Sequence, residues 1–334
     1  MTPQISILLP VFDAERTLAT CLQSIERQTE ARFECVLVDD GSRDGTLRLA
    51  RSFADRDPRF SIVECRHRGL VATLDAGLEH CRAPFVARMD ADDWMHRERL
   101  ALQLRELRDR PELAAVGCHV RLFPRAALTD GRRRYEDWLN GIRDPEELRK
   151  QAFVECPVAH PSLSIRRQLL GAFGYRDAGW PEDYDLILRL LTGGHAIGVV
   201  PKRLLGWRDH PERLSRRGEA YHLERFTACK AAFLADSFLA GGGEYILWGY
   251  GDTGRTLRRA LLRHERRPSH IVELHPGRLG QRIHGAPVIP PQALRELPRR
   301  PIVASVAGER ARSQIRAALA QMGFQELVDF VCAA

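Results

Sequence analysis

The feature that most constrains this sequence is an alternation of strand-like and helix-like segments that starts near its N-terminus. An apolar, β-prone run at 5–9 is followed by an amphipathic stretch at 14–28, whose apolar residues recur at helical spacing. A second run at 33–38 precedes a helical pattern that begins near Thr46. This alternation predicts an α/β fold, doubly wound, with a largely parallel sheet covered by helices on both faces.

The same pattern continues with a strand at 61–65, a helix at 70–80 and a strand at 84–89. In such sheets ligands bind at the carboxyl ends of the strands, so the loops that follow them are the candidate sites. Residues 125–150 are polar and weakly periodic, which indicates a mobile loop or a helical insertion without assigned chemistry.

A length of 334 residues suggests two domains, and the run Gly241-Gly242-Gly243 is the clearest hinge. We therefore expect one domain at 1–240 and a smaller one at 241–334. The second opens with a strand, a glycine-rich turn and a helix, which predicts a Rossmann-like unit. Its candidate second nucleotide site consists of the three turn glycines and an acid near the ribose-binding position: Gly249, Gly251, Gly254 and Glu273.

Most of the net charge of +7 lies in the smaller domain, where 14 arginines face 8 acidic residues. Such a surface attracts anionic lipid, phosphorylated small molecules or nucleic acid, although a solvated arginine-rich face is the simpler explanation. No nucleic-acid-binding motif is visible, so nucleic acid is not an expected partner. The absence of a membrane-spanning run or a basic N-terminal region predicts a cytoplasmic protein, with peripheral contact to the inner face of the membrane as a further hypothesis.

Three aspartates crowd together after the strand at 84–89: Asp90, Asp92 and Asp93. Carboxylates this close repel one another unless a cation joins them. Mg²⁺ or Mn²⁺ fits, because these hard ions prefer oxygen ligands. The alternative is that the three acids are solvated loop residues that cap the next helix.

Two other strand or helix ends carry candidate binding groups. Asp40 lies beside Gly41, where the backbone can approach a ligand, and Phe12 could stack on a base. Asp183 could accept a proton from an attacking hydroxyl, with Glu182 beside it and Trp180 as a surface for a sugar ring. Helix capping explains the acids equally well, and Phe12 could simply fill the core.

Taken in order, these pieces resemble the family-2 glycosyltransferases with the GT-A fold over about residues 4–217. Four segments carry the resemblance: PVFDAE at 10–15, VDDGSRDGT at 38–46, RMDADD at 88–93 and EDYDL at 182–186. The resemblance implies a nucleotide-sugar donor, with UDP favoured, a divalent metal and inversion at the anomeric carbon. The expected acceptor is a hydroxyl of a carbohydrate or a lipid-linked sugar, in surface polysaccharide or glycolipid synthesis.

The resemblance also implies roles for individual residues. Pro10 and Phe12 would line the base pocket, and Asp40 would hydrogen-bond the base. Asp92 would lie nearest the metal, with Asp90 as its partner in the D-x-D pair.

On the acceptor side, the resemblance makes Asp183 the general base. Glu182 and Trp180 would lie near the acceptor, and Arg208 and His210 near the diphosphate or the acceptor loop. The smaller domain resembles Rossmann-like domains appended to some sugar-modifying enzymes.

The sequence departs from the family pattern at three places. Asp13 stands where Asn is usual, His67-Arg68-Gly69 replaces Asn-x-Gly, and Arg97 replaces a common Pro. No departure removes a carboxylate, so they bear on the fit of the donor more than on activity.

Three other functions remain open from the sequence. Sugar-phosphate nucleotidyl transfer would use a similar fold, but its early glycine-rich basic signature is missing between Leu9 and Thr17. Oxidoreduction through the turn at 249–254 would leave most of the chain unused. A non-catalytic nucleotide-sugar-binding protein would not need the full set of acids. The oligomeric state is left open.

Overall fold

The computed structural model describes residues 2–334, including all of their side chains except those of Leu214 and Ser215. Met1, part of the N-terminal segment considered above, lies outside the described residues. The chain forms two compact units: the first comprises Met1–Leu148, Pro157–Ala178 and Arg189–Arg213, and the second comprises Arg149–Cys156, Gly179–Leu188 and Leu214–Ala334. The domain boundary at residue 241 stays a prediction.

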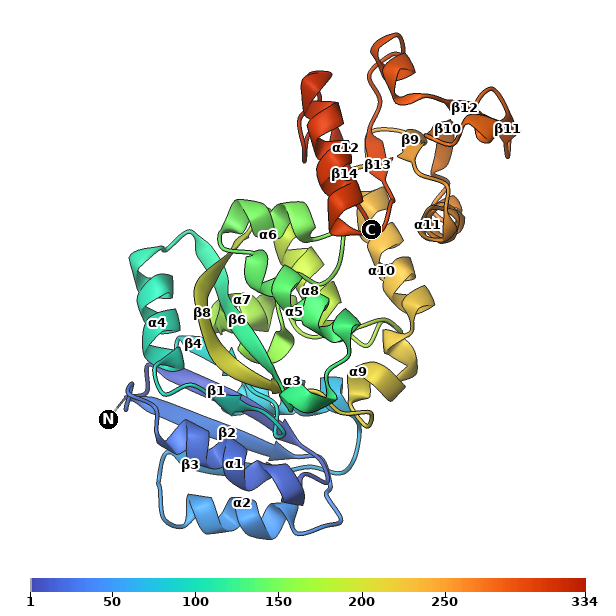
Figure 1. Ribbon diagram of the computed structural model, residues 1–334. Coiled ribbons are helices and arrows are strands. Elements are labelled where there is room, and N and C mark those ends of the chain that lie inside the picture. The colour runs from blue at the N-terminus through green and yellow to red at the C-terminus, as the bar shows by residue number, and fades with distance from the viewer. Residues whose placement is uncertain (1) are drawn as a thin grey trace. The chain divides into compact units, whose positions relative to one another are not determined.

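The first unit contains an eight-stranded sheet with the order β3-β2-β1-β4-β7-β6-β8-β5. Its strands are β1 Ile5–Val11, β2 Phe33–Asp39, β3 Phe60–Glu64, β4 Phe85–Arg88, β5 Trp94–Met95, β6 Leu113–Phe123, β7 Ser164–Arg166 and β8 Ala196–Arg208. β3, β2, β1 and β4 pair in parallel, as do β6 and β8, which run side by side in Figure 1. β7 is antiparallel to both neighbours and β5 is antiparallel to β8, so the sheet is mixed where a largely parallel one was expected.

The α-helices between residues 15 and 192 are α1 Glu15–Glu26, α2 Thr46–Ala54, α3 Leu70–His80, α4 Arg99–Asp109, α5 Asp130–Gly141, α6 Pro145–Gln151, α7 Arg167–Phe173 and α8 Glu182–Thr192. The end of α6 and most of α8 belong to the second unit. The bounds of α3 are those predicted from the sequence. Residues 125–150 contain α5 and α6, so the helical insertion was the correct alternative there.

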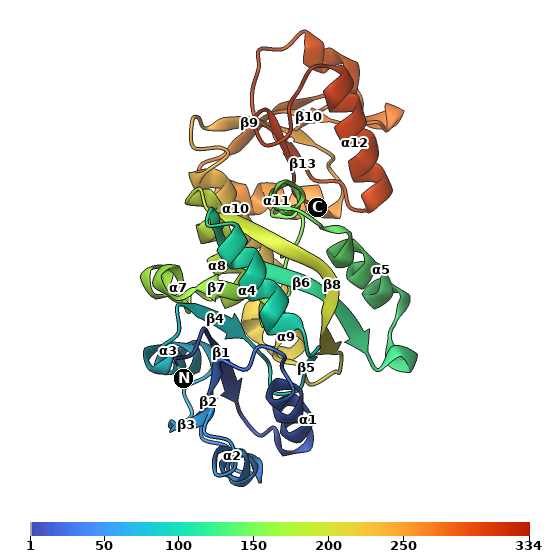
Figure 2. The ribbon, with the colours of Figure 1, turned by 90° about the vertical axis from the view of Figure 1, so that its left-hand side faces the viewer.

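Helices cover both faces of the parallel strands, as a doubly wound fold requires. Ile5, Ile7 and Leu9 of β1 share one core with the buried faces of α1 and α4. On the opposite face, Gly77 of α3 packs so closely that a β-carbon there would lie 2.4 Å from Leu8. Figure 2 shows β1 and β2 between α3 on one side and α1 on the other.

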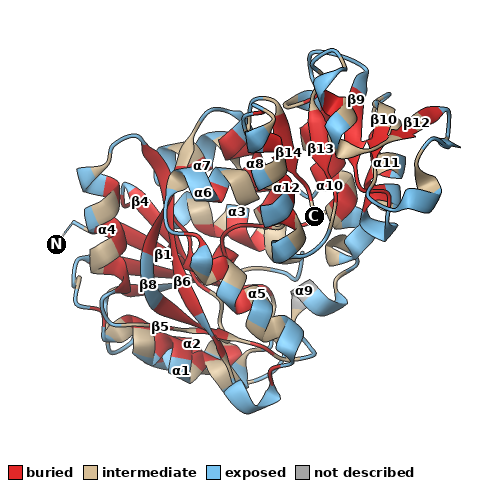
Figure 3. Cartoon of the chain, turned by 45° about the horizontal axis from the view of Figure 1, so that its top comes forward, coloured by how far each residue is buried: buried red, intermediate tan, exposed pale blue. Residues whose placement is uncertain are grey.

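Burial on both faces explains the composition of the central strands. Every residue of β1 and of β2 is buried, which is typical of parallel strands with helices on each side. In Figure 3, β1, β4 and β6 are red over most of their length, whereas α4 and α5 show exposed outer surfaces. Pro10 fits within β1 because its nitrogen, like the backbone of Leu8, faces the β4 side, and β4 pairs with β1 only as far as Leu8.

The second unit contains a smaller sheet with the order β11-β12-β10-β9-β13-β14, in which only β11 and β12 are antiparallel. Its elements are α9 Leu214–Arg217, α10 Leu223–Asp236, β9 Glu244–Trp248, α11 Asp252–Leu262, β10 Arg267–Val272, β11 Arg282–Ile283, β12 Ala286–Ile289, β13 Ile302–Ala304, α12 Glu309–Gln321 and β14 Phe330–Cys332. The parallel pairing of the other strands confirms the expected Rossmann-like unit. Within residues 2–334, no helix has the length and apolar character needed to cross a bilayer.

Candidate functional site

The carboxyl ends of four parallel strands meet at one edge of the first sheet. The loops that leave this edge follow β1, β2, β3 and β4. They carry Phe12, Asp40, His67 and the three aspartates Asp90, Asp92 and Asp93. The fold therefore gathers the predicted base-binding and metal-binding groups at the edge where such sheets bind ligands.

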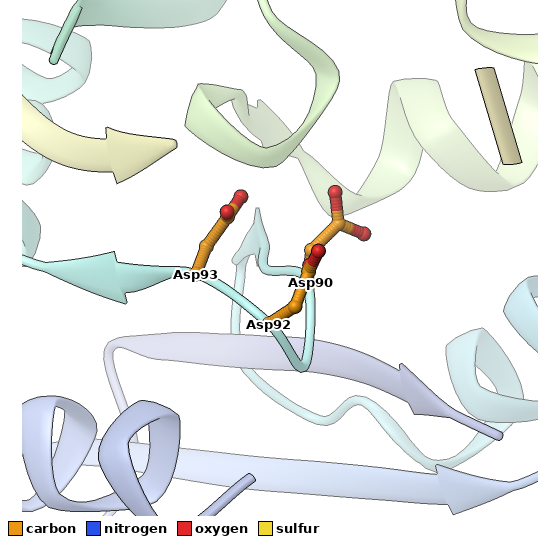
Figure 4. A group of neighbouring side chains, drawn as sticks. All are labelled: Asp90, Asp92 and Asp93. Atoms are coloured by element: carbon orange, nitrogen blue, oxygen red, sulfur yellow. The ribbon is translucent and has the colours of Figure 1, made fainter. Parts of the chain in front are cut away.

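The loop between β4 and β5 places three carboxylates together. An oxygen of each of Asp90, Asp92 and Asp93 lies within 4.8 Å of the others. Figure 4 shows the three side chains on one side of the loop. The arrangement is compact enough for all three to contact one small cation.

Asp93 is the most deeply buried of the three, with 2% of its surface exposed. Its Oδ1 accepts a hydrogen bond from the backbone N–H of Arg208 at 2.7 Å, whereas its buried Oδ2 has no hydrogen-bond partner among the described residues. Burial raises the pKa of Asp93 well above its ordinary value, and the carboxylates of Asp92 and Asp90 raise it further. An unpartnered carboxylate oxygen in this position is costly unless a proton or a cation occupies it.

Asp90 has a different environment. Burial acts to raise the pKa of its carboxyl, but Arg88, together with Arg213 and His160, outweighs this effect and holds the pKa below its ordinary value. Nη2 of the buried Arg88 donates to Oδ1 of Asp90 at 2.6 Å. Asp90 is therefore kept as a carboxylate, the form that binds metal.

Two residues from the end of β8 reach the same cluster. Nε2 of His210 lies 2.9 Å from Oδ2 of Asp92. Nε of Arg208 donates to the backbone carbonyl of Asp92 at 2.8 Å, and its guanidinium lies 4.6 Å from the centre of the Phe123 ring. The structure thus brings Arg208 and His210, predicted for the diphosphate side, to the aspartates.

These groups fit a divalent cation with a preference for oxygen. Three carboxylates converge, one of them held as a carboxylate by an arginine and another with an unused buried oxygen. Mg²⁺ and Mn²⁺ favour such ligands and complete their shells with water or phosphate oxygens. No sulfur ligand belongs to the cluster among the described residues, so a softer metal is not favoured.

Asp40 is buried and engaged by the loop that follows β3. Its Oδ1 accepts from the N–H of Arg68 at 2.8 Å, and its Oδ2 accepts from the N–H of Gly69 at 3.0 Å. Nδ1 of His67 lies 2.8 Å from the same Oδ2, and the His67 ring stacks on Phe12 with centroids 4.2 Å apart. His67 therefore lies beside Phe12 and Asp40 of the predicted base pocket.

The remaining polar residues of the segment at 38–46 hold the first two loops together. Both carboxylate oxygens of Asp44 accept backbone hydrogen bonds, Oδ1 from the N–H of Thr46 and Oδ2 from the N–H of Glu15. The N–H of Asp13 donates to the Ser42 hydroxyl. These contacts join the starts of α1 and α2. Asp44, Asp13 and Ser42 therefore have a structural role in holding the two loops together.

The segment proposed to meet the acceptor begins α8 and belongs to the second unit. Asp183 is partly exposed, and its Oδ1 accepts from the N–H of Tyr184 at 2.7 Å. Glu182 is buried and accepts a hydrogen bond from the Tyr221 hydroxyl. Nε1 of Trp180 donates to Asp185, so the three predicted residues lie together at the start of one helix.

The glycine-rich turn of the second sheet has the backbone form that its sequence predicts. Gly249 has φ +94°, and a β-carbon on Gly254 would lie 2.1 Å from the carbonyl oxygen of Gly249. The Glu273 carboxylate accepts from the N–H of Tyr250 at 2.8 Å and from Arg278 at 3.0 Å. Glu273 therefore holds the turn, and binding of a nucleotide there stays a prediction.

Comparison with known families decides the class of the first unit. The model of glycosyl transferase family 2 matches residues 6–173, just over half of the chain. This chain belongs to glycosyl transferase family 2. It is 29% identical over 216 residues to the amylovoran biosynthesis glycosyltransferase AmsE of Erwinia amylovora, covering 64% of this chain and 79% of AmsE. It is 27% identical over 238 residues to EpsE of Bacillus subtilis, covering 68% of this chain and 82% of EpsE.

Solved structures confirm the GT-A-like fold of this family-2 chain. TarS of S. aureus, in complex with UDP-GlcNAc, has a TM-score of 0.57 and 15% identity, covering 79% of this chain and 72% of that one. The mannosyltransferase PcManGT from Pyrobaculum calidifontis, in complex with GDP-Man and Mn²⁺, has a TM-score of 0.54 and 20% identity. The match covers 79% of this chain and 69% of that one. At these identities the likeness shows the fold alone.

The family-2 site also contains groups that the sequence did not reveal. Arg88 lies two residues before Asp90, and a basic residue so near three acids could have been noticed. His67 appears in the sequence only as a departure from the family pattern. Its contact with Asp40 crosses from the loop after β3 to the loop after β2, which no local spacing predicts.

Proposed function

We propose that this enzyme transfers a sugar from a nucleotide-sugar donor, with UDP as the expected carrier, to a hydroxyl of a carbohydrate or lipid-linked acceptor. The observation that carries the proposal is the group of three aspartates with the unpartnered Oδ2 of Asp93. The fold neighbours that hold UDP-GlcNAc, or GDP-Man with Mn²⁺, support it. The relative AmsE, named for amylovoran biosynthesis, supports a place in surface polysaccharide or glycolipid synthesis.

In this scheme Asp92 and Asp90 hold a divalent cation, Mn²⁺ or Mg²⁺, with Asp93 beside them. When bound, the cation would supply positive charge that stabilises the departing nucleoside diphosphate. Arg88 keeps Asp90 ionised, and Arg208 fixes the backbone of Asp92. The cluster is therefore organised before the donor arrives, which is what electrostatic stabilisation of a transition state requires.

The proposed transfer is a single displacement with inversion. Asp183 removes the proton of the acceptor hydroxyl while that oxygen forms a bond to the anomeric carbon. The bond from this carbon to the diphosphate oxygen breaks on the opposite face, and the nucleoside diphosphate leaves with the electron pair. Pro10, Phe12 and Asp40 line the base side of the donor site in this proposal.

The test is release of nucleoside diphosphate from a panel of nucleotide sugars, with and without an acceptor extract. We expect release from at least one donor in Mn²⁺ or Mg²⁺, loss of release in chelator, and recovery when metal is returned. Asp92→Asn should abolish release, whereas Asp109→Asn, at an exposed end of α4, should not. Full activity in chelator, or no activity with any nucleotide sugar, would contradict the proposal.

We also propose that the basic surface of the second unit contacts anionic lipid. Arg255 and Arg259 of α11 are exposed, as is Arg263 at its C-cap. Of these three, only Arg255 has an ion pair among the described residues. Arginines near an anionic membrane each contribute about 1 kcal/mol of binding energy. A lipid-linked acceptor would be reached from such a surface.

Sedimentation with vesicles tests this contact. The full chain should bind vesicles that contain phosphatidylglycerol more than pure phosphatidylcholine vesicles, and the binding should weaken with salt. The double change Arg259→Glu with Arg263→Glu should abolish it. The same charge change on the first unit, Arg16→Glu with Arg105→Glu, is the control, and equal loss in both variants would contradict a specific surface.

A further inference from the structure

A fully buried arginine begins the helix that follows the acidic cluster. Arg99 is the first residue of α4, and none of its surface is exposed. A guanidinium stays protonated in proteins, and a buried charge is costly unless the groups around it satisfy it. The contacts of Arg99 therefore have to explain why this charge lies in the interior.

The Arg99 guanidinium contacts the end of β4 with two of its nitrogens. Nη2 donates to the backbone carbonyl of Arg88 at 2.9 Å, and Nη1 lies 3.4 Å from the sulfur of Met89. These two residues directly precede Asp90. The same stretch of backbone carries the Arg88 side chain, which donates to the Asp90 carboxylate. Arg99 thus holds the segment from which both partners of that contact project.

Gln103, one turn later in α4, fixes the direction of the Arg99 side chain. Its Oε1 accepts from Nε of Arg99 at 3.1 Å and from the Ser164 hydroxyl at 2.9 Å. Its Nε2 donates to the carbonyls of Val116 at 2.9 Å and Ser162 at 2.8 Å. All four hydrogen-bonding positions of this amide are used, and they join α4 to β6 and β7. Such a network leaves Arg99 little freedom to move.

None of the groups in contact with Arg99 is an acid. Among the described residues it forms no ion pair, and its three acceptors are a carbonyl, a sulfur and an amide oxygen. Burial lowers the pKa of Arg99, whereas Cys118 and Asp93 act in the opposite direction. Asp93 of the acidic cluster therefore supplies negative charge that no direct partner of Arg99 provides.

These contacts require an arginine rather than a lysine. A guanidinium presents its N–H groups in fixed directions from three nitrogens, and here each nitrogen meets a different acceptor. A lysine ammonium offers one nitrogen at the end of a flexible chain, with no equivalent of Nε to contact Gln103. The match between guanidinium and acceptors indicates that Arg99 holds its neighbours in one geometry.

We propose that Arg99 is a positioning residue of the cation site: it fixes the end of β4 so that Asp90 faces the cation, and Gln103 holds Arg99 in place. This inference rests on the proposed function, because the cation belongs to that function. In a purely structural role, Arg99 would contribute to the stability of the fold without affecting the affinity for metal. The two roles therefore differ in a quantity that can be measured.

Binding of Mn²⁺, followed by the loss of the electron paramagnetic resonance signal of free Mn²⁺, measures this affinity without turnover. Full-length wild type would be compared with Arg99→Met, Arg99→Lys and Gln103→Met, with and without UDP. Urea unfolding would report the stability of each variant. Arg166→Met is the matched control, because Arg166 also donates to backbone carbonyls but pairs with Phe85 at the opposite end of β4.

We expect Arg99→Met and Arg99→Lys each to weaken Mn²⁺ binding about 10- to 100-fold, the scale of groups that orient metal ligands, and Gln103→Met to weaken it by a smaller factor. Loss of a positive charge near the site would by itself strengthen cation binding, so weaker binding in Arg99→Met reports position and not charge. The double variant should bind no more weakly than Arg99→Met alone, because Gln103 acts through Arg99. Arg166→Met should lose stability and keep the wild-type affinity.

Wild-type or stronger Mn²⁺ binding in folded Arg99→Met would overturn the inference and leave the proposed function intact. Wild-type affinity in Arg99→Lys would also overturn it, because charge alone would then suffice. If the Arg99 variants did not fold, Gln103→Met would decide, and unchanged affinity there would contradict the positioning role. If the wild type bound no Mn²⁺, with or without UDP, both the inference and the proposed function would be wrong.

Discussion

Single side chains of the acidic cluster depend on partners that lie far away in the chain. Oδ1 of Asp93 is held by the backbone of Arg208, and Oδ2 of Asp92 lies beside His210, both at the end of β8. Three acids in one loop would otherwise repel one another and spread. The end of β8 therefore keeps the carboxylates together, while Oδ2 of Asp93 has no hydrogen-bond partner in the part of the chain that the structure describes.

At Asp183 we predict a loss of turnover with retained donor binding. Asp183→Asn removes the proposed proton acceptor, and loss of a general base lowers the rate by about 10² to 10⁴. Turnover and the dissociation constant of the donor would be measured separately. Asp177→Asn, at an exposed aspartate a few residues earlier, should leave both unchanged. Near-normal turnover of Asp183→Asn would remove it from the mechanism.

Individual site residues differ in how far the sequence could identify them. Asp90, Asp92 and Asp40 stand out because acids at strand ends need an explanation. The partners that neutralise or cover them come from other strands, as with His210 and His67. Such contacts depend on the path of the chain in three dimensions, which spacing along the sequence does not contain.

Among the elements, α1 and α2 are linked by Asp44, which accepts hydrogen bonds from the N–H groups of their first residues, Glu15 and Thr46. Hydrogen bonds from the first turns of α1 and α2 to the Asp44 carboxylate favour its ionised form. Burial acts to raise the pKa of Asp44, but the hydrogen bonds from Thr46 and Glu15 lower it below its ordinary value. Such a carboxylate stabilises the fold when ionised and loses that effect when it is protonated.

We therefore predict that Asp44→Ala lowers the free energy of unfolding by about 1 to 2 kcal/mol at neutral pH, the scale of a helix cap. Because the folded pKa is the lower one, the difference from wild type should be present above about pH 4 and shrink as the pH falls through the folded pKa. Urea unfolding at several pH values measures it. Asp109→Ala, at the exposed end of α4, is the control, and a difference that grew at acid pH would contradict the account.

The elements near the N-terminus were predicted better than those in the middle. Regular alternation of apolar runs and amphipathic stretches identified β1 to α3 with shifts of one or two residues. The long strands β6 and β8 were not predicted. β8 contains Pro201-Lys202-Arg203 in its middle, which breaks the apolar pattern, and the direction of β7 depends on pairing that the sequence does not show.

At the scale of the whole molecule, segments from three parts of the chain form the second unit. A buried lysine joins the segment at 149–156 to the C-terminal one. Nζ of Lys230 donates to the carbonyl of Val154 at 3.0 Å and to that of Ala333 at 2.8 Å. Burial lowers the pKa of Lys230 from 10.5 to about 8. Charged Lys230 therefore destabilises the folded state, and the unfolded state binds more protons between these two pKa values.

We predict that the contribution of Lys230 to stability rises with pH. The difference in free energy of unfolding between wild type and Lys230→Met should shift in favour of wild type by about 2 kcal/mol between about pH 7.5 and about pH 9.5. Lys202→Met, at an exposed lysine, should show no such trend. A difference that stayed constant with pH would mean that Lys230 keeps an ordinary pKa.

The central claim is that the aspartates at the end of β4 bind a cation and, through it, a nucleoside diphosphate. Thermal melting of the wild type with UDP, GDP, ADP and CDP, each with Mn²⁺ or with chelator, tests this most directly, with Asp93→Asn beside it. We predict that at least one nucleoside diphosphate raises the melting temperature only when metal is present. Asp93→Asn should lower the affinity for the metal about 10- to 100-fold and so reduce this rise in melting temperature. Stabilisation of equal size in chelator, or none with any nucleotide, would contradict the account.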